Sequence, residues 1–288
     1  MKLRSVNLFV LNWNGRDLTL DCLSSLEKIT YPNVKVYVID NGSSDNSVTA
    51  IRNQFPEKSV FNSIYEIIEL PENYGFARGN NAGFELVKQK ADYTIFLNND
   101  TIVDPNFVEP LINAMESNST VKQSTPKIFY ADNLDYIWFG GGKVSLWAGW
   151  IRHLGIRQKD SMQFSFNRNV DYATGCCVCM RTVDFESIGM FDESFLMYGE
   201  DVDLSLRFRK QGGQILFVPE SKIWHKVSSS IGTQFSIRKW KRKNIGKMKL
   251  VTKHVHPAQL PIVMPLAILV SILELFITII LGFGRKHS

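Results

Sequence analysis

The chain has 288 residues, of which 44% are hydrophobic and 21% charged, and its formal net charge is +5. This composition excludes an intrinsically disordered or fibrous protein, and the length allows one large core or a core with an appendage. The charge is uneven, because residues 221–288 contain twelve Lys and Arg against one acid, whereas residues 1–220 contain 21 against 27. Such a basic tail is typical of a segment that meets an anionic surface, either a membrane or a nucleic acid.

The first residues lead directly into an apolar strand pattern at 5–11, without the charged and apolar leader of a secretory signal. We therefore expect the body of the protein to lie in the cytosol, with its four cysteines reduced. Three of them, Cys176, Cys177 and Cys179, lack the paired spacing of a zinc site and predict a buried strand.

Short apolar runs alternate with helical patterns through the first hundred residues. This alternation predicts an α/β fold in which helices cover both faces of a mostly parallel central sheet. The strands are predicted at 8–11, 34–39, 64–70 and 93–98, and the helices at 17–28 and 82–90.

Each predicted strand ends in a polar cluster, at residues 12–15, 40–45, 71–81 and 98–100. The carboxyl edge of such a sheet is where open α/β folds bind ligands. Alone, the last cluster could equally be a turn that caps a helix starting at 105. Its recurrence after every strand favours a ligand site.

The chemistry of these clusters suggests a nucleotide ligand, although neither G-x-G-x-x-G nor a P-loop motif is present. Asp40 can accept hydrogen bonds from a ribose or a base, or it can simply cap its own turn. Arg78 can hold a diphosphate, or it can be a solvated arginine at a helix start. Asp100 can bridge a Mg²⁺ ion to a diphosphate, because this ion keeps waters and accepts phosphate oxygens.

Four segments, 10–15, 38–45, 73–81 and 97–100, resemble in order the motifs of family 2 inverting glycosyltransferases with a GT-A fold. The resemblance is closest to the rhamnosyltransferase-like branch and spans roughly residues 5–245. It implies a GT-A type α/β fold and a divalent metal, Mg²⁺ or Mn²⁺, near Asp100. Asn-Asn-Asp at 98–100 replaces the Asp-x-Asp of many relatives, which leaves one carboxylate for the metal. The residues implied to bind the nucleotide sugar are Asn12, Asp40, Asn73, Gly75, Arg78 and Asn99.

The second half begins with a predicted helix at 105–116 and a strand at 122–130. Residues 131–169 are rich in Trp and Gly, so aromatic rings such as Trp138 can stack on a sugar or form a small core. A strand is predicted at 170–181, where the small Thr174–Gly175 pair allows a ligand to approach closely. This strand resembles the one beside the family's acceptor site, which implies acceptor-side roles for Thr174, Gly175 and Trp138.

Glu200 and Asp201 open a predicted helix and are the candidate general base for attack by an acceptor hydroxyl. They can also be an acidic first turn favoured by the helix dipole, with Asp203 and Arg207 paired one turn apart. The resemblance places the catalytic carboxylate in this pair, with Asp201 favoured over Glu200. Trp224-His225, followed by serines at 228–230, resembles the family's terminal motif, in which the histidine completes the metal site or contacts the diphosphate.

The predicted catalytic domain covers residues 1–232, with a nucleotide-sugar half at 1–104 and an acceptor half at 105–232. The tail at 233–288 combines a basic helix at 238–253 with an apolar segment at 266–283. That segment borders on a membrane span, but Glu274 also allows an interfacial helix, a helix packed on a partner, or a soluble core helix. The basic flank would keep the body at the cytoplasmic face of the membrane.

The expected function is a membrane-associated, metal-dependent hexosyltransferase that transfers one sugar with inversion. The donor would be a nucleotide-diphosphate sugar such as dTDP-rhamnose or a UDP-sugar, and the acceptor a lipid-linked or surface glycan. Single transfer is expected because residues 234–240 lack the Q-x-x-R-W spacing of processive synthases. The alternatives are a nucleotidyltransferase of related fold and a catalytically silent module that binds nucleotide sugars or lipids. No nucleic-acid partner is expected, because the basic block runs into an apolar segment.

Overall fold

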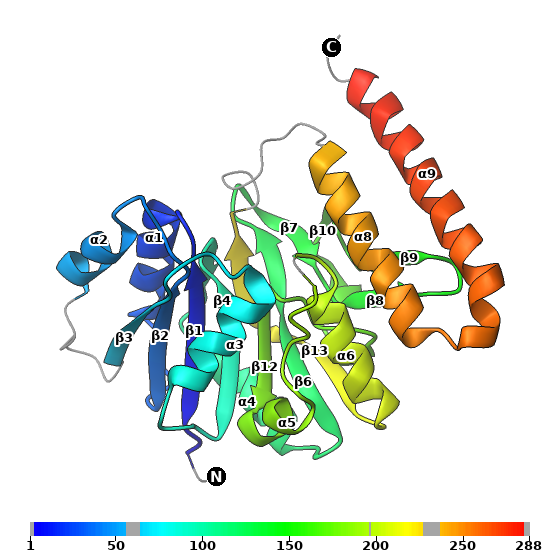
Figure 1. The fold of residues 1–288 in the computed structure, drawn as a ribbon. Coiled ribbons are helices and arrows are strands. Elements are labelled where there is room, and N and C mark those ends of the chain that lie inside the picture. The colour runs from blue at the N-terminus through cyan, green and yellow to red at the C-terminus, as the bar shows by residue number, and fades with distance from the viewer. Residues whose placement is uncertain (1–2, 56–63, 196, 227–236, 285–288) are drawn as a thin grey trace.

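The computed structural model describes residues 3–55, 64–195, 197–226 and 237–284. Its main feature is an 11-stranded sheet with helices on both faces and two long C-terminal helices beside it (Figure 1). The strands are β1 (Val6–Asn12), β2 (Val34–Asp40), β3 (Ile64–Glu69), β4 (Tyr93–Asn98), β5 (Thr101–Val103), β6 (Val121–Tyr130), β7 (Asn133–Phe139), β8 (Gly142–Ser145), β9 (Trp150–His153), β10 (Gln158–Lys159), β11 (Arg168–Val170), β12 (Cys177–Arg181) and β13 (Gln214–His225). The helices are α1 (Arg16–Leu26), α2 (Ser47–Gln54), α3 (Phe76–Leu86), α4 (Val108–Glu116), α5 (Thr182–Ser187), α6 (Glu200–Lys210), α8 (Ile237–His254) and α9 (Leu260–Gly284), with short 3₁₀ turns η1 (Met162–Phe164) and η2 (Pro257–Gln259).

The first four long strands form the parallel part of the sheet in the order β3-β2-β1-β4. They are rich in β-branched and aromatic residues and buried on both faces, as parallel strands covered by helices require. Because the strands are parallel, their carboxyl ends meet at one edge, where Asn12 aligns with Asp40. The predicted α/β fold with a mostly parallel central sheet flanked by helices is confirmed.

The second half of the sheet is mixed. β12 pairs antiparallel with β4 and β6, whereas β13 runs parallel to β6 and antiparallel to β5. The single strand predicted at 170–181 is wrong in detail, because β11 and β12 are separated by a turn at 171–176. The backbone leaves the ladder there since Cys177 N–H donates to Thr174 O (3.2 Å) and Gly175 N–H donates to the Asp201 carboxylate (2.9 Å).

Two apolar cores lie on opposite faces of the sheet. Leu8 and Val10 of β1 pack in one core with α1, α2 and α4, whereas Phe9 packs in the other with α3, α5 and α6 (Figure 1). This division follows from the alternation of side chains along a strand. Cys177 and Cys179 are fully buried free thiols in β12, which confirms the predicted buried strand for these two, whereas Cys176 is buried in the turn before it.

The two C-terminal helices pack against each other and against the body. Val251 of α8 and Val255, which follows that helix, form a small core with Val263 and Ala267 of α9, and Leu146 of the β8–β9 region packs against it. Helix α9 begins at Leu260, earlier than the predicted apolar segment, and continues through Pro265.

Glu274 of α9 is about half exposed and forms an ion pair with α8. Its carboxylate is 2.8 Å from Lys247 Nζ of α8, which also lies 3.2 Å from Ser271 Oγ. The Lys247 side chain is 9% exposed, so this ion pair fixes the two helices side by side from within their interface. The predicted domain boundary at 232/233 lies outside the described residues.

Gly83 of α3 lies against Ile39 of β2, where a Cβ atom would overlap Cδ1 and Cγ1 of Ile39. We expect Gly83→Ala to lower the free energy of unfolding by about 1–3 kcal/mol, since overpacking outweighs the better helix propensity of alanine. Urea unfolding should show a smaller loss when Ile39→Val removes Cδ1 first. An equal loss in both backgrounds would contradict the steric explanation.

Candidate active site

The ends of β1 and β2 place Asn12 beside Asp40 at the carboxyl edge of the sheet. Asn12 Nδ2 donates to Asp40 Oδ1 (2.8 Å) and to Ser43 Oγ (3.1 Å), and Asp40 Oδ2 accepts from Ser43 N–H (3.0 Å). Asp40 therefore does cap the turn that follows β2. The same bonds hold its carboxylate fixed at the edge, which is the position that nucleotide recognition requires; that role stays a prediction.

Asn99, in the turn after β4, braces the loop after β1. Its Nδ2 donates to Thr19 Oγ1 (2.9 Å) and to Asn12 Oδ1 (3.2 Å). Gly15 permits this approach, because a Cβ atom there would be 2.5 Å from Asn99 Nδ2. The amides of Asn12 and Asn99 are thus engaged within the protein and connect two polar loops of the edge.

The loop before α3 has a fixed shape. Asn41 Nδ2 donates to Asn73 Oδ1 (3.0 Å) and Gly75 O (3.1 Å), while Gly75 N–H donates to Asn73 Oδ1 (2.8 Å). Gly75 has φ +78°, which glycine adopts without strain. Arg78 is exposed, and its guanidinium stacks 3.9 Å from the centre of the Tyr74 ring. This stacking presents a preorganised cation at the edge.

The fold brings Asp100 and His225 together from opposite halves of the chain. β13 pairs with β5 so that His225 lies opposite Thr101, the residue after Asp100. His225 Nε2 is 3.0 Å from Asp100 Oδ1, and both residues are buried. The Trp138 ring packs edge-on against the imidazole at 4.3 Å. A predicted acceptor-side residue thus contacts a predicted metal ligand.

This pair fits a divalent cation that draws most of its ligands from elsewhere. Within the described residues, no three His, Cys, Asp or Glu side chains form a metal site. Asp100 and His225 supply one carboxylate and one imidazole, and it is Nε2 of the imidazole that faces the carboxylate. Mg²⁺ or Mn²⁺ would complete its shell with water and diphosphate oxygens. Serines 228–230 of the predicted terminal motif lie outside the described residues.

The predicted base is held by the predicted acceptor-side turn. Asp201, in the first turn of α6, accepts from Gly175 N–H at Oδ2 (2.9 Å) and from Val202 N–H at Oδ1 (2.8 Å). Gly175 has room for no large side chain, since its Cβ would be 3.2 Å from the Phe76 ring and 3.6 Å from Asp201 Cβ. The preceding Thr174 is buried, and its hydroxyl accepts from Cys176 N–H (3.3 Å).

Glu200 and Asp201 have different surroundings. Burial, and then the charge of Asp201, raise the pKa of Glu200 to about 8. Burial also raises the pKa of Asp201, although the N–H groups of Gly175 and Val202 favour its ionised form. Glu200 Oε2 is buried without a hydrogen-bond partner among the described residues. Asp201 therefore ionises first, and its charge helps to keep Glu200 protonated.

The two carboxylate centres belong to one region of the molecule. Burial raises the pKa of the Cys176 thiol well above its ordinary value, and the charges of Asp100 and Asp201 raise it further. The backbone connects the same region, because Asn98 N–H at the end of β4 donates to Cys176 O (2.9 Å), next to the Gly175 turn that holds Asp201. The Asn-Asn-Asp turn and the first turn of α6 are therefore joined through residues 174–176.

Sequence reasoning missed several members of this region. His153 of β9 contacts the Trp138 ring edge-on at 4.6 Å, and burial lowers its pKa to about 4. Thr19 and Asn41 connect the polar loops through their hydrogen bonds. Asn41 could have been found as the neighbour of Asp40 in the motif, whereas His153 lies in a Trp- and Gly-rich stretch without a distinguishing pattern.

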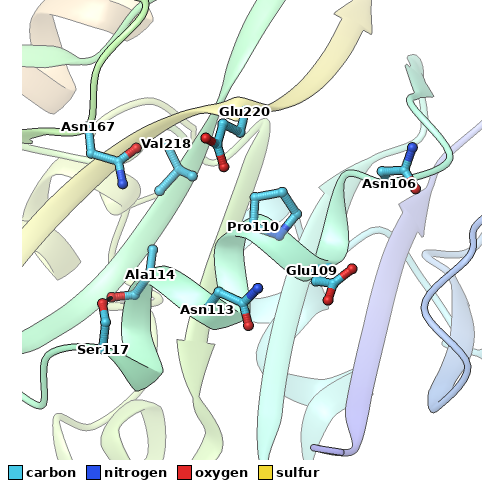
Figure 2. Close-up of a pocket in the computed structure, with 9 residues that line it drawn as sticks. All are labelled: Asn106, Glu109, Pro110, Asn113, Ala114, Ser117, Asn167, Val218 and Glu220. Carbon is cyan, nitrogen blue, oxygen red and sulfur yellow. Dashed lines mark hydrogen bonds between the residues drawn. The ribbon is translucent and has the colours of Figure 1, made fainter. Parts of the chain in front are cut away.

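A surface pocket of about 450 Å³ lies elsewhere, between α4 and β13 (Figure 2). None of the predicted site residues lines it, so it is separate from the carboxyl edge. The lining residues are Asn106, Glu109, Pro110, Asn113, Ala114, Ser117, Asn167, Val218 and Glu220.

Curated proteins with similar sequences act in glycan assembly, by their names. N-acetylglucosaminyl-diphospho-decaprenol L-rhamnosyltransferase of Mycobacterium tuberculosis is 26% identical over 229 residues, which cover 73% of this chain and 72% of that protein. Rhamnosyltransferase WbbL of Escherichia coli is 30% identical over 155 residues, 51% of this chain and 58% of WbbL. O-antigen biosynthesis protein RfbC of Myxococcus xanthus is 25% identical over 72% of this chain, which spans 16% of RfbC.

Solved structures show the same fold. Mannosyltransferase PcManGT from Pyrobaculum calidifontis, in complex with GDP-Man and Mn²⁺, matches 93% of this chain and 70% of its own with a TM-score of 0.63 and 16% identity. GalNAc-T7 with UDP, GalNAc and Mn²⁺ matches 84% of this chain and 48% of its own with a TM-score of 0.61 and 16% identity. The predicted GT-A type architecture is confirmed.

The family model described as glycosyl transferase family 2 matches residues 8–189, which include the polar loops, the Asn-Asn-Asp turn and the Thr174–Gly175 turn. Together with the rhamnosyltransferase relatives, this match establishes the resemblance that the four sequence motifs indicated. The chain belongs to glycosyl transferase family 2.

Proposed function

We propose that the protein is an inverting hexosyltransferase that moves one sugar from a nucleotide-diphosphate donor, dTDP-rhamnose or a UDP-sugar, to a lipid-linked or surface-glycan acceptor. Asp201 is the general base, with Glu200 beside it, and Asp100 and His225 are the metal ligands. Support for rhamnose as the sugar comes from the two relatives named as rhamnosyltransferases. Mn²⁺ accompanies the nucleotides in both structural neighbours.

The observation that carries this proposal is the hydrogen bond from Gly175 N–H to Asp201. It fixes the carboxylate with one oxygen atom engaged by the turn and the other by its own helix. The side chain remains partly exposed in the first turn of α6, so it can meet an acceptor hydroxyl. A positioned, ionised carboxylate on the acceptor side is what inverting transfer requires of the protein.

The residues of the edge would divide the work of one displacement. Asp40 would bind the base or ribose of the nucleotide, and Arg78 the diphosphate. The acceptor hydroxyl attacks the anomeric carbon on the face opposite the diphosphate, whose bond to the sugar breaks. The hydroxyl proton passes to Asp201, and a nucleoside diphosphate leaves. A divalent cation held by Asp100 and His225 would neutralise the negative charge that develops on the leaving group.

The C-terminal helices support a membrane location for the acceptor. Within the described residues, one helical stretch, Pro257–Phe276, is long and apolar enough to cross a membrane by length and composition, and 17% of it is buried. Leu269, Leu273 and Phe276 are more than half exposed. The ion pair between Lys247 and Glu274 packs α9 against α8, whose sequence is rich in Lys and Arg. The exposed apolar face of α9 therefore lies beside a basic helix. We propose that it lies on the cytoplasmic face of a membrane.

Replacing Asp201 by Asn should leave the donor bound but reduce sugar transfer by about 10²–10⁴-fold, since no group then takes the acceptor proton. Donor binding is measured by thermal shift with Mn²⁺, and turnover by release of nucleoside diphosphate from a panel of nucleotide sugars. Glu186→Gln, an exposed acid on α5, is the control. Retained turnover in Asp201→Asn would reject the assignment, and release of pyrophosphate by the wild type would indicate a nucleotidyltransferase.

Asp100→Asn and His225→Gln should each raise the Mn²⁺ concentration for half-maximal turnover by about 10-fold or more, because each removes one of two protein ligands. Calorimetric titration of nucleoside diphosphate, with and without Mn²⁺, gives a second measure. In both variants, Mn²⁺ should no longer increase the affinity for the nucleoside diphosphate, whereas the affinity measured without Mn²⁺ should equal that of the wild type. An unchanged Mn²⁺ requirement in Asp100→Asn would remove the proposed metal site.

Glu200→Gln should stabilise the protein increasingly as the pH rises. The folded pKa of Glu200 lies at about 8 against an ordinary 4.5, so folding takes up a proton in that window and stability falls as pH rises through it. A neutral Gln avoids this loss. We expect the free energy of unfolding of Glu200→Gln to exceed that of the wild type by an amount that grows from about pH 4.5 to about pH 8 and then levels off at roughly 2–4 kcal/mol. Urea unfolding from pH 4 to 9 measures it, and a pH-independent difference would contradict the raised pKa.

A further inference from the structure

Asp203 is a fully buried carboxylate on the catalytic helix that the proposed reaction does not use. Its oxygens contact the nitrogen atoms of three basic side chains. These are Arg207 Nε of the same helix (2.8 Å), and His254 Nε2 and Lys253 Nζ of α8 (each 2.7 Å). Burial alone would raise the pKa of Asp203, but hydrogen bonds from His254, Lys253 and Arg207 outweigh it and hold the pKa below its ordinary value. The carboxylate is therefore an ionised connection between α6 and α8.

Helix α8 also lies against the turn that leads into α6. A Cβ atom on Gly246 would overlap the carbonyl oxygen of Tyr198, so the two backbones touch at a point that tolerates only glycine. Gly199 has φ +106°, and a Cβ atom there would lie 3.3 Å from the Leu250 side chain of α8 and 3.0 Å from the Phe195 ring. The residues directly before Glu200 are thus confined by α8.

Further contacts involve the loop at 188–192, which precedes α6 in the chain. Lys253 Nζ of α8 lies 2.6 Å from the Asp192 carboxylate of this loop. Arg207 donates through its two terminal nitrogens to Ile188 O (2.6 Å) and Met190 O (2.5 Å). One buried cluster centred on Asp203 therefore joins α8, the catalytic helix and the 188–192 loop.

We propose that Asp203 is a positioning residue through which α8 sets the location of the catalytic carboxylates. This inference rests on the proposed function, because it assumes that Glu200 and Asp201 act on the acceptor. Helix α8 is then part of the catalytic centre as well as of the membrane-facing helix pair.

The physical reason is the precision that proton transfer demands. Gly175 fixes the Asp201 carboxylate from one side, but it cannot fix the rotation or translation of α6, whose first turn carries both acids. The Asp203 cluster and the Gly246 contact supply the opposing constraint. A displacement of about 1 Å at a reacting group can cost about 10²-fold in rate.

Asp203→Asn, His254→Gln and Gly246→Ala test this proposal, with His256→Gln as the matched control on an exposed histidine two residues beyond the cluster. We expect kcat for sugar transfer, or for donor hydrolysis by water, to fall by about 10–100-fold in the three variants. The KM for the donor and its Mn²⁺-dependent thermal shift should stay at the wild-type value, because the nucleotide edge is untouched. His256→Gln should behave as the wild type.

Hydrogen exchange of the amides at 195–204 gives a readout that needs no turnover. The three variants should exchange faster there than the wild type, while β1 and β2 stay protected. Absence of transfer in the wild type would reject the proposed function, whereas faster exchange would still support the connection to α8. Wild-type kcat and exchange in Asp203→Asn and His254→Gln would overturn the inference. So would equal losses of kcat and donor affinity, since they would indicate a general loss of structure.

Discussion

The pairing of a buried carboxylate, Glu200, with a partly exposed one, Asp201, at the start of α6 is the constraint on which the rest of the site depends. Burial raises the pKa of both Glu200 and Asp201, so the fold holds them at a cost in free energy that other contacts must offset. The Gly175 N–H group offsets part of it at Asp201. The remaining support comes from α8, which lies against the turn before Glu200 and binds Asp203. Strain of this kind is typical of a functional site.

The same edge illustrates how a parallel sheet assembles a site from distant parts of the chain. Asp40 arrives from the first half at the end of β2, and Arg78 in the first turn of α3, which follows β3. His225 arrives from the last strand, because β13 pairs with β5 next to Asp100. Asp100 and His225 contribute one side chain each. A metal bound at the proposed site would therefore take its remaining ligands from water and from the diphosphate of the donor.

The C-terminal helices connect this site to the proposed membrane surface. The ion pair between the buried Lys247 and the half-exposed Glu274 holds α9 against α8, and the cluster around Asp203 holds α8 against α6. Removing the partners of buried Lys247 or buried Asp203 would leave an uncompensated charge, so both connections favour one fixed arrangement. An acceptor with a lipid part would then enter a site whose distance from the membrane is set by two packed helices.

The sequence by itself determined the fold class, the alternation of strands and helices in the first hundred residues, and most polar residues of the edge, because hydrophobic periodicity and polar strand ends are local signals. It made Glu200 and Asp201 candidates for the general base only through resemblance, since an acidic first turn also has a plain structural explanation. Tertiary structure alone decided that Asn99 braces Asn12, that Gly175 holds Asp201 and that His254 binds Asp203. These contacts join residues 26 to 87 positions apart, and no local pattern encodes which distant partner a side chain will meet.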